Sequence, residues 1–253
     1  MKKKGLMALL LTALAVALAT SCREQAAPEE KQNVGTSTSI EGDSTLYGLA
    51  CYGCTDTVLV FLPGRGGDPV SYNILEATKN HQIIGHPQVG DWVAVIRNGK
   101  DSTKADMVIN LDLLKGNWVS QVMPMLRERI ETNEQDSVYM AEQDSLVAEL
   151  MKPMEIGFQL KRHYMAQPVG RQYARRNSDD SPVIYPSIRN YIQWHVINGK
   201  LVLTANLDEL ATVSDGNKPQ KVENDTAEFI FLLRDSLRLR FKNGERGYYR
   251  KTE

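Results

Sequence analysis

Short apolar segments of strand length, separated by turn residues, dominate the C-terminal part of the chain. Two hairpin signals are clear: Asn198-Gly199 leads into residues 200–205, and Asn243-Gly244 turns the last pair of segments. Within residues 236–241, leucine and phenylalanine alternate with serine and arginine, the pattern of a strand with one buried face. Because hairpin follows hairpin without a crossover helix, we predict an up-and-down β-barrel or a strongly curved sheet.

The strands expected in this part of the chain are 155–165, 169–176, 183–185, 191–197, 200–205, 227–233, 236–242 and 246–251. Residues 127–152 interrupt the series, because they contain neither glycine nor proline and are rich in good helix formers. We expect one helix there, ended by Pro153, that packs across the mouth or side of the barrel.

Gly116 and Trp118 lie near the beginning of this β-rich segment. The sequence Gly-x-Trp at that place resembles the signature of the lipocalin family. In lipocalins the tryptophan lies on the first strand and closes the base of the barrel, with a C-terminal arginine packed across it. The resemblance implies that Trp118 has this closing role and that Arg240 or Arg250 packs on its ring. Alternatively, Trp118 is a buried tryptophan of another antiparallel β fold.

Residues 45–112 form a separate group of strand-like segments, expected at 57–62, 70–75, 92–96 and 105–111. No part of this region shows a convincing helical period. We therefore predict a small antiparallel sheet, curled into a barrel. A Gly-Asp turn that leads into a hydrophobic strand, as Gly90-Asp91 does here, is common in OB-like and SH3-like barrels.

Two cysteines, Cys51 and Cys54, precede the first of these expected strands. Together with Gly48, Thr55 and Thr57 they resemble the N-terminal domain of envelope-stress and copper-resistance lipoproteins, where Gly-x-x-x-Cys-x-x-Cys leads into a threonine-containing strand. Three interpretations are open: a disulfide that pins a tight turn, a thiolate site for Cu(I) or Zn, and a redox-exchange site. We expect the disulfide, since the pair runs into a strand and the four histidines show no ligand spacing.

Residues 1–22 have the layout of a secretory signal: lysines, an apolar run at 6–19, and small residues before Cys22. The run is shorter than the roughly 20 apolar residues that span a bilayer. Residues 18–22 resemble the lipobox of bacterial lipoproteins, in which the peptide is cut before the cysteine, whose thiol carries a diacylglycerol and whose amine is acylated. The resemblance implies that Cys22 anchors the chain to a membrane. The alternative is an ordinary signal peptide that leaves Cys22 as a free thiol.

Residues 23–44 contain almost no large apolar side chain and predict a flexible tether. Glu24, Glu29 and Glu30 look like the export signals of surface lipoproteins in some two-membraned bacteria, or they are plain solubilising charge. The formal net charge is −1, so loss of the three signal lysines leaves a mature chain near −4. Such a chain gains little from polyanions, and we expect no nucleic-acid partner.

The sequence contains no Gly-x-Ser-x-Gly, no His-Glu-x-x-His and no glycine-rich dinucleotide turn after a strand. We therefore expect no catalytic residue, no metal ligand and no cofactor. His81 and His86 are expected on surface loops.

The expected organisation is a signal peptide at 1–21, a tether at 22–44, a small β domain at 45–112 and a lipocalin-like β domain at 113–253. The expected function is that of a non-catalytic binding lipoprotein in the outer membrane of a bacterial cell envelope, facing the periplasm or the cell surface. It would hold a small apolar ligand or dock on another envelope protein. The alternative is an envelope-stress or metal-responsive sensor that acts through Cys51 and Cys54.

Overall fold

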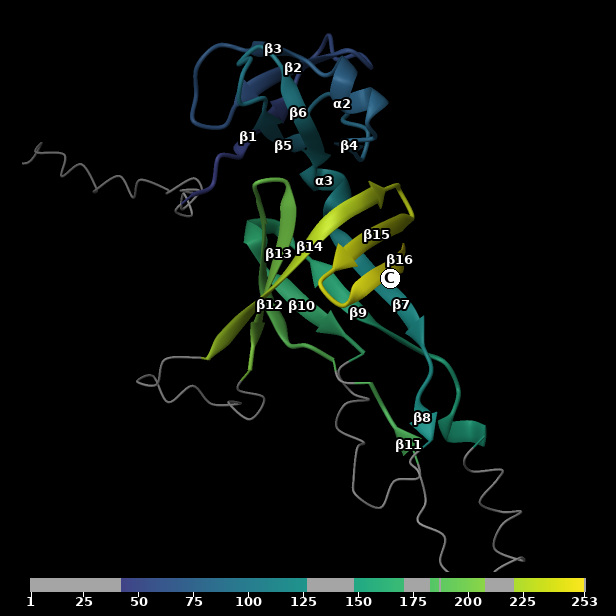
Figure 1. Cartoon of the computed structure of the whole chain (residues 1–253). Helices are drawn as coiled ribbons and strands as arrows, with labels where there is room; N and C mark the ends of the chain where they lie inside the picture. Colours follow the sequence, from purple (N-terminus) through teal and green to yellow (C-terminus); the bar gives the residue numbers. More distant parts are fainter. Residues whose placement is uncertain (1–41, 127–147, 171–182, 187, 208–220, 253) are drawn as a thin grey trace, which may run out of the picture. The chain divides into compact units, whose positions relative to one another are not determined.

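The computed structural model of the chain describes residues 42–126, 148–170, 183–186, 188–207 and 221–252. The described residues all belong to one structural unit. Within the described residues the strands form a six-stranded sheet, an eight-stranded sheet and a two-stranded ribbon (Figure 1). The predicted mainly β class is confirmed.

The eight-stranded sheet is an up-and-down barrel with the strand order β10-β9-β7-β16-β15-β14-β13-β12. Its strands are β7 (Gly116–Val122), β9 (Met154–Leu160), β10 (Ala166–Val169), β12 (Tyr191–Ile197), β13 (Lys200–Asn206), β14 (Val222–Leu232), β15 (Ser236–Phe241) and β16 (Gly244–Arg250). All pairs along this order are antiparallel. An antiparallel bridge between Met165 and Gln193 joins the β10 edge to the β12 edge, so the sheet is nearly closed. The predicted up-and-down β-barrel is confirmed.

The hairpin between β12 and β13 shows how local sequence sets the register of the barrel. Asn198 and Gly199 have φ angles of 48° and 79°, the left-handed pair that a two-residue primed turn requires. Ile197 consequently pairs with Lys200. The turn is also held from outside, because the Asn198 backbone N–H donates to Thr45 Oγ1 at 2.9 Å.

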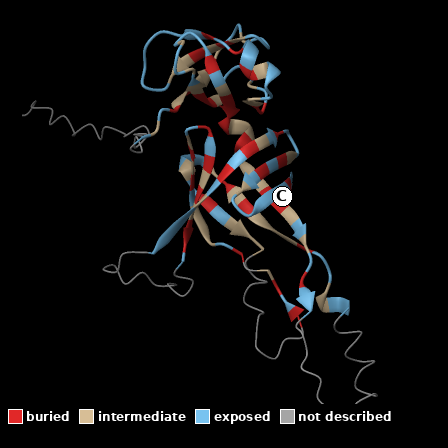
Figure 2. Cartoon of the chain, in the orientation of Figure 1, coloured by how far each residue is buried: buried red, intermediate tan, exposed pale blue. Residues whose placement is uncertain are grey.

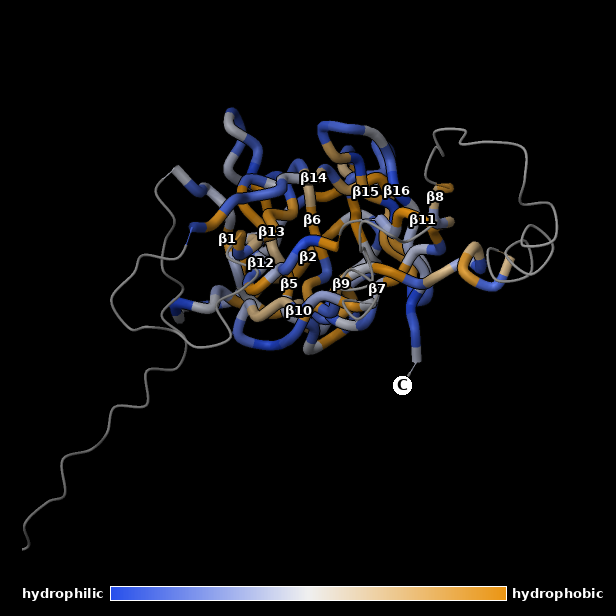
Figure 3. The backbone as a smooth tube through the Cα atoms, turned by 90° about the horizontal axis from the view of Figure 1, so that it is seen from below, coloured by the Kyte–Doolittle hydropathy of each residue, from blue (hydrophilic) through white to orange (hydrophobic). Residues whose placement is uncertain are grey.

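Large apolar side chains fill the interior of the barrel. Trp118, Phe158, Trp194, Phe229 and Tyr248 are all buried and belong to one apolar cluster. The rings of Phe158 and Tyr248 lie 5.0 Å apart between centroids. Along the strands, buried residues are interspersed with exposed ones (Figure 2). Apolar residues are likewise interspersed with polar ones (Figure 3). Burial of these apolar side chains is the main contribution to the stability of the barrel.

The six-stranded sheet has the order β3-β2-β1-β5-β6-β4. Its strands are β1 (Leu46–Ala50), β2 (Val58–Pro63), β3 (Val70–Asn73), β4 (Ile83–Ile84), β5 (Trp92–Arg97) and β6 (Ala105–Asn110). Two features differ from the prediction: β1 was not among the expected strands, and β4 pairs parallel to β6 in a sheet that was expected to be antiparallel.

A short helix, α2 (Leu75–Lys79), follows β3 where the sequence predicted no helix and a strand that continued to residue 75. The Asn73 side-chain oxygen accepts the Leu75 N–H at 3.0 Å and so turns the chain out of the strand. The helix then leads the chain to β4, on the far edge of the sheet. The chain passes from β4 to β6 by way of β5, and this indirect connection allows the β4–β6 pair to be parallel.

A second short helix, α3 (Leu111–Leu114), connects the small sheet to the barrel. The Asn110 side chain accepts the Leu113 N–H at 2.9 Å and caps it. Leu111 and Leu114 are fully buried in the same apolar cluster as Ile84 of the small sheet and the barrel core. Ile84, Ala94 and Ile109 of the small sheet therefore pack in the same hydrophobic cluster as the barrel core, whereas Leu59, Phe61 and Val95 belong to a second cluster within the small sheet.

The remaining strands, β8 (Met125–Leu126) and β11 (Val183–Ile184), pair with each other in the two-stranded ribbon. The helix expected at 127–152 lies mostly outside the described residues. Of its described part, residues 148–150 are helical. No helix in the described part of the chain is long and apolar enough to cross a membrane.

Candidate functional site

A groove of about 290 Å³ lies between the small sheet and the end of β14. This volume is at the lower end of the range for small-molecule sites. Most of its lining is apolar: Val58, Leu59, Ile74, Ile83, Ile84, Pro87, Ile230, Phe231, Leu232 and Leu233. Thr55, Thr78, Cys54, Asp56, His81 and His86 supply its polar groups. We call this site the β14 groove.

A β-bulge in β14 builds one wall of the β14 groove. The register of β14 against β15 shifts between Phe229 and Phe231. Phe229 is 8% exposed and Leu232 is 3% exposed, whereas Phe231 is 36% exposed. Strict alternation would place Phe229 and Phe231 on the same face, so the bulge is what turns Phe231 out of the barrel and into the groove.

Gly85 lets β4 approach this wall closely. A Cβ atom on Gly85 would lie 3.0 Å from Leu232 Cδ2 and 2.9 Å from Leu113 Cδ2, and the φ angle of Gly85 is 72°. A larger residue would push the end of β4 away from Leu232 and widen the groove.

The polar edge of the β14 groove is organised around Asp56. His86 Nε2 lies 3.1 Å from Asp56 Oδ1, and both side chains are largely exposed. The Thr78 hydroxyl donates to the Asp56 backbone carbonyl at 2.7 Å, which ties α2 to the loop before β2. An exposed polar contact of this kind contributes at most about 1 kcal/mol to stability. The sequence predicted His86 to be a surface residue but did not indicate its partner.

Cys51 and Cys54 are both free thiols in the structure, so the disulfide predicted between them is not formed. Each sulfur instead contacts backbone groups of the β1–β2 hairpin in which the two cysteines lie. Cys54 Sγ donates to the Cys51 carbonyl at 3.1 Å and accepts the Val60 N–H at 3.3 Å. Cys51 Sγ points toward the Leu49 carbonyl at 3.8 Å. Of the two, only Cys54 lines the β14 groove.

The described residues include no group of three or more His, Cys, Asp or Glu side chains that could hold a metal ion. Cys22, the predicted site of lipid attachment, lies outside the described residues.

Trp118 lies on β7, the first strand of the barrel, and is completely buried. Its indole N–H donates to the Leu114 carbonyl at 2.7 Å. The guanidinium carbon of Arg250 lies 4.3 Å from the centre of the indole ring. Trp118 and Arg250 are also backbone partners where β7 meets β16, which joins the first strand of the barrel to the last. The other candidate, Arg240, lies on the exposed face and pairs with Glu245 at 2.8 Å.

The Arg250 guanidinium is fixed by three backbone carbonyls. Its Nη1 donates to Lys115 O at 2.7 Å, its Nε donates to Arg234 O at 2.6 Å, and its Nη2 donates to Leu113 O. Burial lowers the pKa of Arg250 from its ordinary value. These carbonyls belong to α3, the link to β7 and the turn after β14, so Arg250 holds together the end of the barrel nearest the small sheet.

A second group of half-buried polar residues has a structural role. The Tyr47 hydroxyl contacts Asp43 Oδ2 at 3.0 Å and donates to the Val196 carbonyl. Burial, with the nearby charge of Asp43, raises the pKa of Tyr47. Tyr164 stacks on His195 with 4.7 Å between ring centres, and burial lowers the pKa of His195. The Tyr47 contact ties the start of the small sheet to β12, and the Tyr164 ring packs on β12 from the connection between β9 and β10. None of these residues lines the β14 groove.

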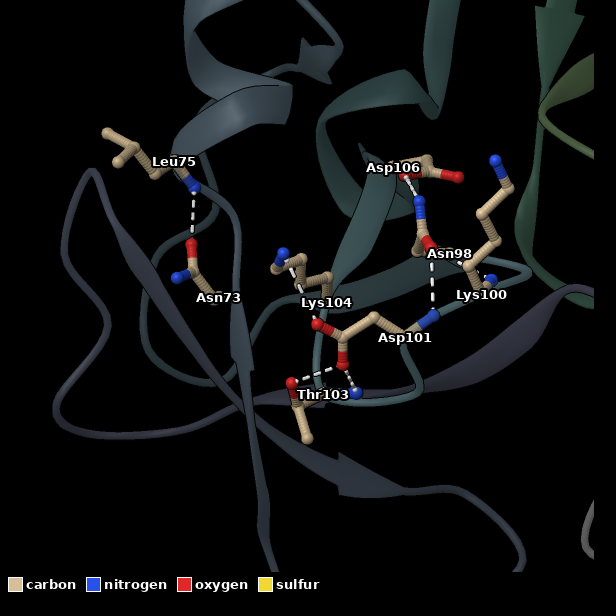
Figure 4. A network of polar contacts seen from close by, with 8 residues as sticks. All are labelled: Asn73, Leu75, Asn98, Lys100, Asp101, Thr103, Lys104 and Asp106. Carbon is tan, nitrogen blue, oxygen red and sulfur yellow. Dashed lines mark hydrogen bonds and ion pairs between the residues drawn. The ribbon is translucent and has the colours of Figure 1, made fainter.

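Polar side chains also gather in the loop between β5 and β6 (Figure 4). Asp101 Oδ1 accepts from the Thr103 N–H at 3.0 Å and from the Thr103 hydroxyl at 2.6 Å. These hydrogen bonds, with Lys104, lower the pKa of Asp101. The Asn98 side-chain oxygen accepts the backbone N–H groups of Lys100 and Asp101. These hydrogen bonds stabilise the conformation of the loop itself, and the loop is not a candidate site.

No protein-family model matches the chain, and no curated protein matches it. Among solved structures, the crystal structure of a lipocalin-like protein from Bacteroides thetaiotaomicron is similar over 54% of this chain and 95% of its own length. The sequence identity is 18% and the TM-score is 0.28. The strand order and pairing described above, rather than this likeness, define the barrel.

Proposed function

We propose that the protein is a non-catalytic binding protein of the bacterial cell envelope, attached to the outer membrane through a lipid on Cys22. Its ligand is a small apolar molecule held in the β14 groove. The observation that carries this proposal is the groove itself, a concave and mainly apolar surface with a few polar groups at one edge. The barrel interior is a less suitable chamber, because Trp118, Phe158 and Trp194 pack within it.

The chemistry of the β14 groove favours an apolar body in the ligand. Leu59 and Ile84 are fully buried beneath the groove, whereas Leu233 is exposed on its wall. A ligand that covers Leu233 and Phe231 removes apolar surface from water, which contributes about 25 cal/mol for each Å² buried. Leu59, Ile74, Ile84 and Leu232 of the lining already pack in the hydrophobic clusters, so the ligand does not have to order these side chains when it binds.

A charge on the wall of the β14 groove is expected to weaken binding. Leu233→Asp would place a carboxylate against the apolar ligand, and we expect at least a tenfold rise in Kd because that carboxylate loses water without gaining a partner. The measurement is fluorescence titration with 1-N-phenylnaphthylamine, an uncharged apolar probe.

The matched control for this measurement is Leu126→Asp. Leu126 and Leu233 are both 57% exposed, but Leu126 lies on β8 and does not line the groove. Probe binding should be unchanged by Leu126→Asp. Equal Kd values for the two variants would contradict the assignment of the groove as the binding site.

The lipid anchor is tested by Cys22→Ser in a bacterial host that carries out lipoprotein maturation. We expect the variant to lose metabolically incorporated palmitate and to leave the membrane fraction, because several buried acyl chains are what make such an anchor stable. Cys51→Ser and Cys54→Ser serve as matched controls and should keep both the label and the membrane location. Palmitate retained by the Cys22→Ser chain would show that the anchor is elsewhere.

A further inference from the structure

We infer that the ligand of the β14 groove carries a positively charged nitrogen beside its apolar body, and that this cation binds at Asp56. The inference rests on the proposed function and deepens it by naming the chemical class of the ligand. It is an amphiphile with an alkyl or similar apolar part and an ammonium head.

The charges of the groove lining favour a cation. Among the described residues that line the groove, Asp56 is the only one with a carboxylate, and none is a lysine or an arginine. The nearby Lys79, which follows Thr78 of the lining, already pairs with Glu76 at 3.2 Å. An ammonium head at Asp56 is therefore attracted, whereas the carboxylate of a fatty acid would meet a like charge with no cation in the lining to offset it.

The hydrogen bonds of Asp56 leave it able to accept a ligand. Within the described part of the chain, its side chain is engaged through Oδ1, by His86 Nε2 at 3.1 Å. Oδ2 has no hydrogen-bond partner among the described residues, so it can accept from an ammonium N–H or lie against a quaternary nitrogen. The side chain of Asp56 is 78% exposed, so it does not have to be stripped of water before the ligand arrives.

The opposite wall supports the same choice. Phe231, turned outward by the bulge in β14, adds a partly exposed aromatic ring to the lining. The face of an aromatic ring attracts cations because of its negative quadrupole, and does not attract carboxylates. A carboxylate at one edge and an aromatic ring in the wall together distinguish a cationic amphiphile from an anionic one.

The test compares three probes with the same decyl chain: decyltrimethylammonium, decanol and decanoate. Affinities are measured by displacement of 1-N-phenylnaphthylamine at pH 7.5, in low salt, below the micelle concentration of each probe. We expect the ammonium to bind about two- to fivefold more tightly than decanol, the range for one solvent-exposed charge pair, and decanoate to bind most weakly. The difference should shrink in high salt.

Variants at Asp56 separate charge from shape. Asp56→Asn should bring the three affinities within about twofold of one another and leave decanol unchanged, and Asp56→Lys should reverse the order in favour of decanoate. The matched control is Asp68→Lys, which makes the same charge change on an exposed residue that does not line the groove and should keep the wild-type order.

The outcomes distinguish the two proposals. If decanol binds and Leu233→Asp weakens it, but the ammonium binds no better than decanoate, the cation assignment is overturned and the proposed function stands. If the ammonium keeps its full advantage over decanol and decanoate in Asp56→Asn, another group selects the cation and the assignment to Asp56 is wrong. If none of the three probes binds, the groove is not a ligand site and both proposals fail.

Discussion

Replacing Trp118 with alanine is expected to lower the free energy of unfolding by about 3–5 kcal/mol, the range for removing a large aromatic side chain from a core. The indole is fully buried, and its N–H is satisfied by the Leu114 carbonyl. The substitution leaves a cavity at the end of the barrel and also removes the ring on which the Arg250 guanidinium lies. Arg250 would then remain partly buried without its aromatic partner.

The measurement is urea unfolding followed by circular dichroism, after probes of the small sheet and the barrel have been shown to give one transition. Tyr52→Ala is the matched control, because it also removes an aromatic side chain but at a position 90% exposed. It should change stability by less than about 0.5 kcal/mol. A loss below about 1 kcal/mol in Trp118→Ala would show that the ring does not support the barrel.

Much of the barrel could be predicted from the sequence because its information is local. Alternation in β15 placed Leu237 and Leu239 inside and Arg240 outside, and the structure has them there. The Asn198-Gly199 turn was recognisable because few residues other than asparagine and glycine adopt two successive left-handed conformations. An alternation of apolar and polar residues with a period of two, together with a primed turn, is enough to define a hairpin.

The small sheet was harder to predict because its pairings are not local. The parallel contact between β4 and β6 joins segments with no hairpin between them, and two residues of β4 are too few to show a period. The helix α2 depends on one hydrogen bond from Asn73 rather than on an amphipathic pattern. Such features are determined by the sheet as a whole.

The β14 groove could not be predicted for a related reason. It combines residues 54–87 with residues 230–233, which no pattern in the sequence connects. Its wall also depends on the bulge that turns Phe231 outward, and a bulge breaks the alternation from which strand faces are predicted. In the same way, the spacing of Cys51 and Cys54 suggested a disulfide, but the backbone of the turn directs the Cys54 sulfur toward Val60.

Gly157→Ala is expected to destabilise the barrel by about 2–4 kcal/mol through a clash between backbones. Gly157 lies on β9 opposite Val119 of β7. A Cβ atom built on it would lie 1.9 Å from the Trp118 carbonyl oxygen and 2.9 Å from the Val119 Cα. Because these are backbone atoms of the neighbouring strand, no side-chain rotation can relieve the contact. The two strands must separate, and hydrogen bonds between β7 and β9 are weakened.

Gly247→Ala in β16 is the matched control, since a Cβ atom there meets nothing within 4 Å. That variant should be neutral or more stable by up to about 1 kcal/mol, because alanine has less conformational freedom in the unfolded chain. Urea unfolding of both variants measures the difference, and amide hydrogen exchange should show faster exchange along β7 and β9 in Gly157→Ala alone. If the two alanine variants proved equally stable, β7 and β9 would not be as closely paired at Gly157 as this structure has them.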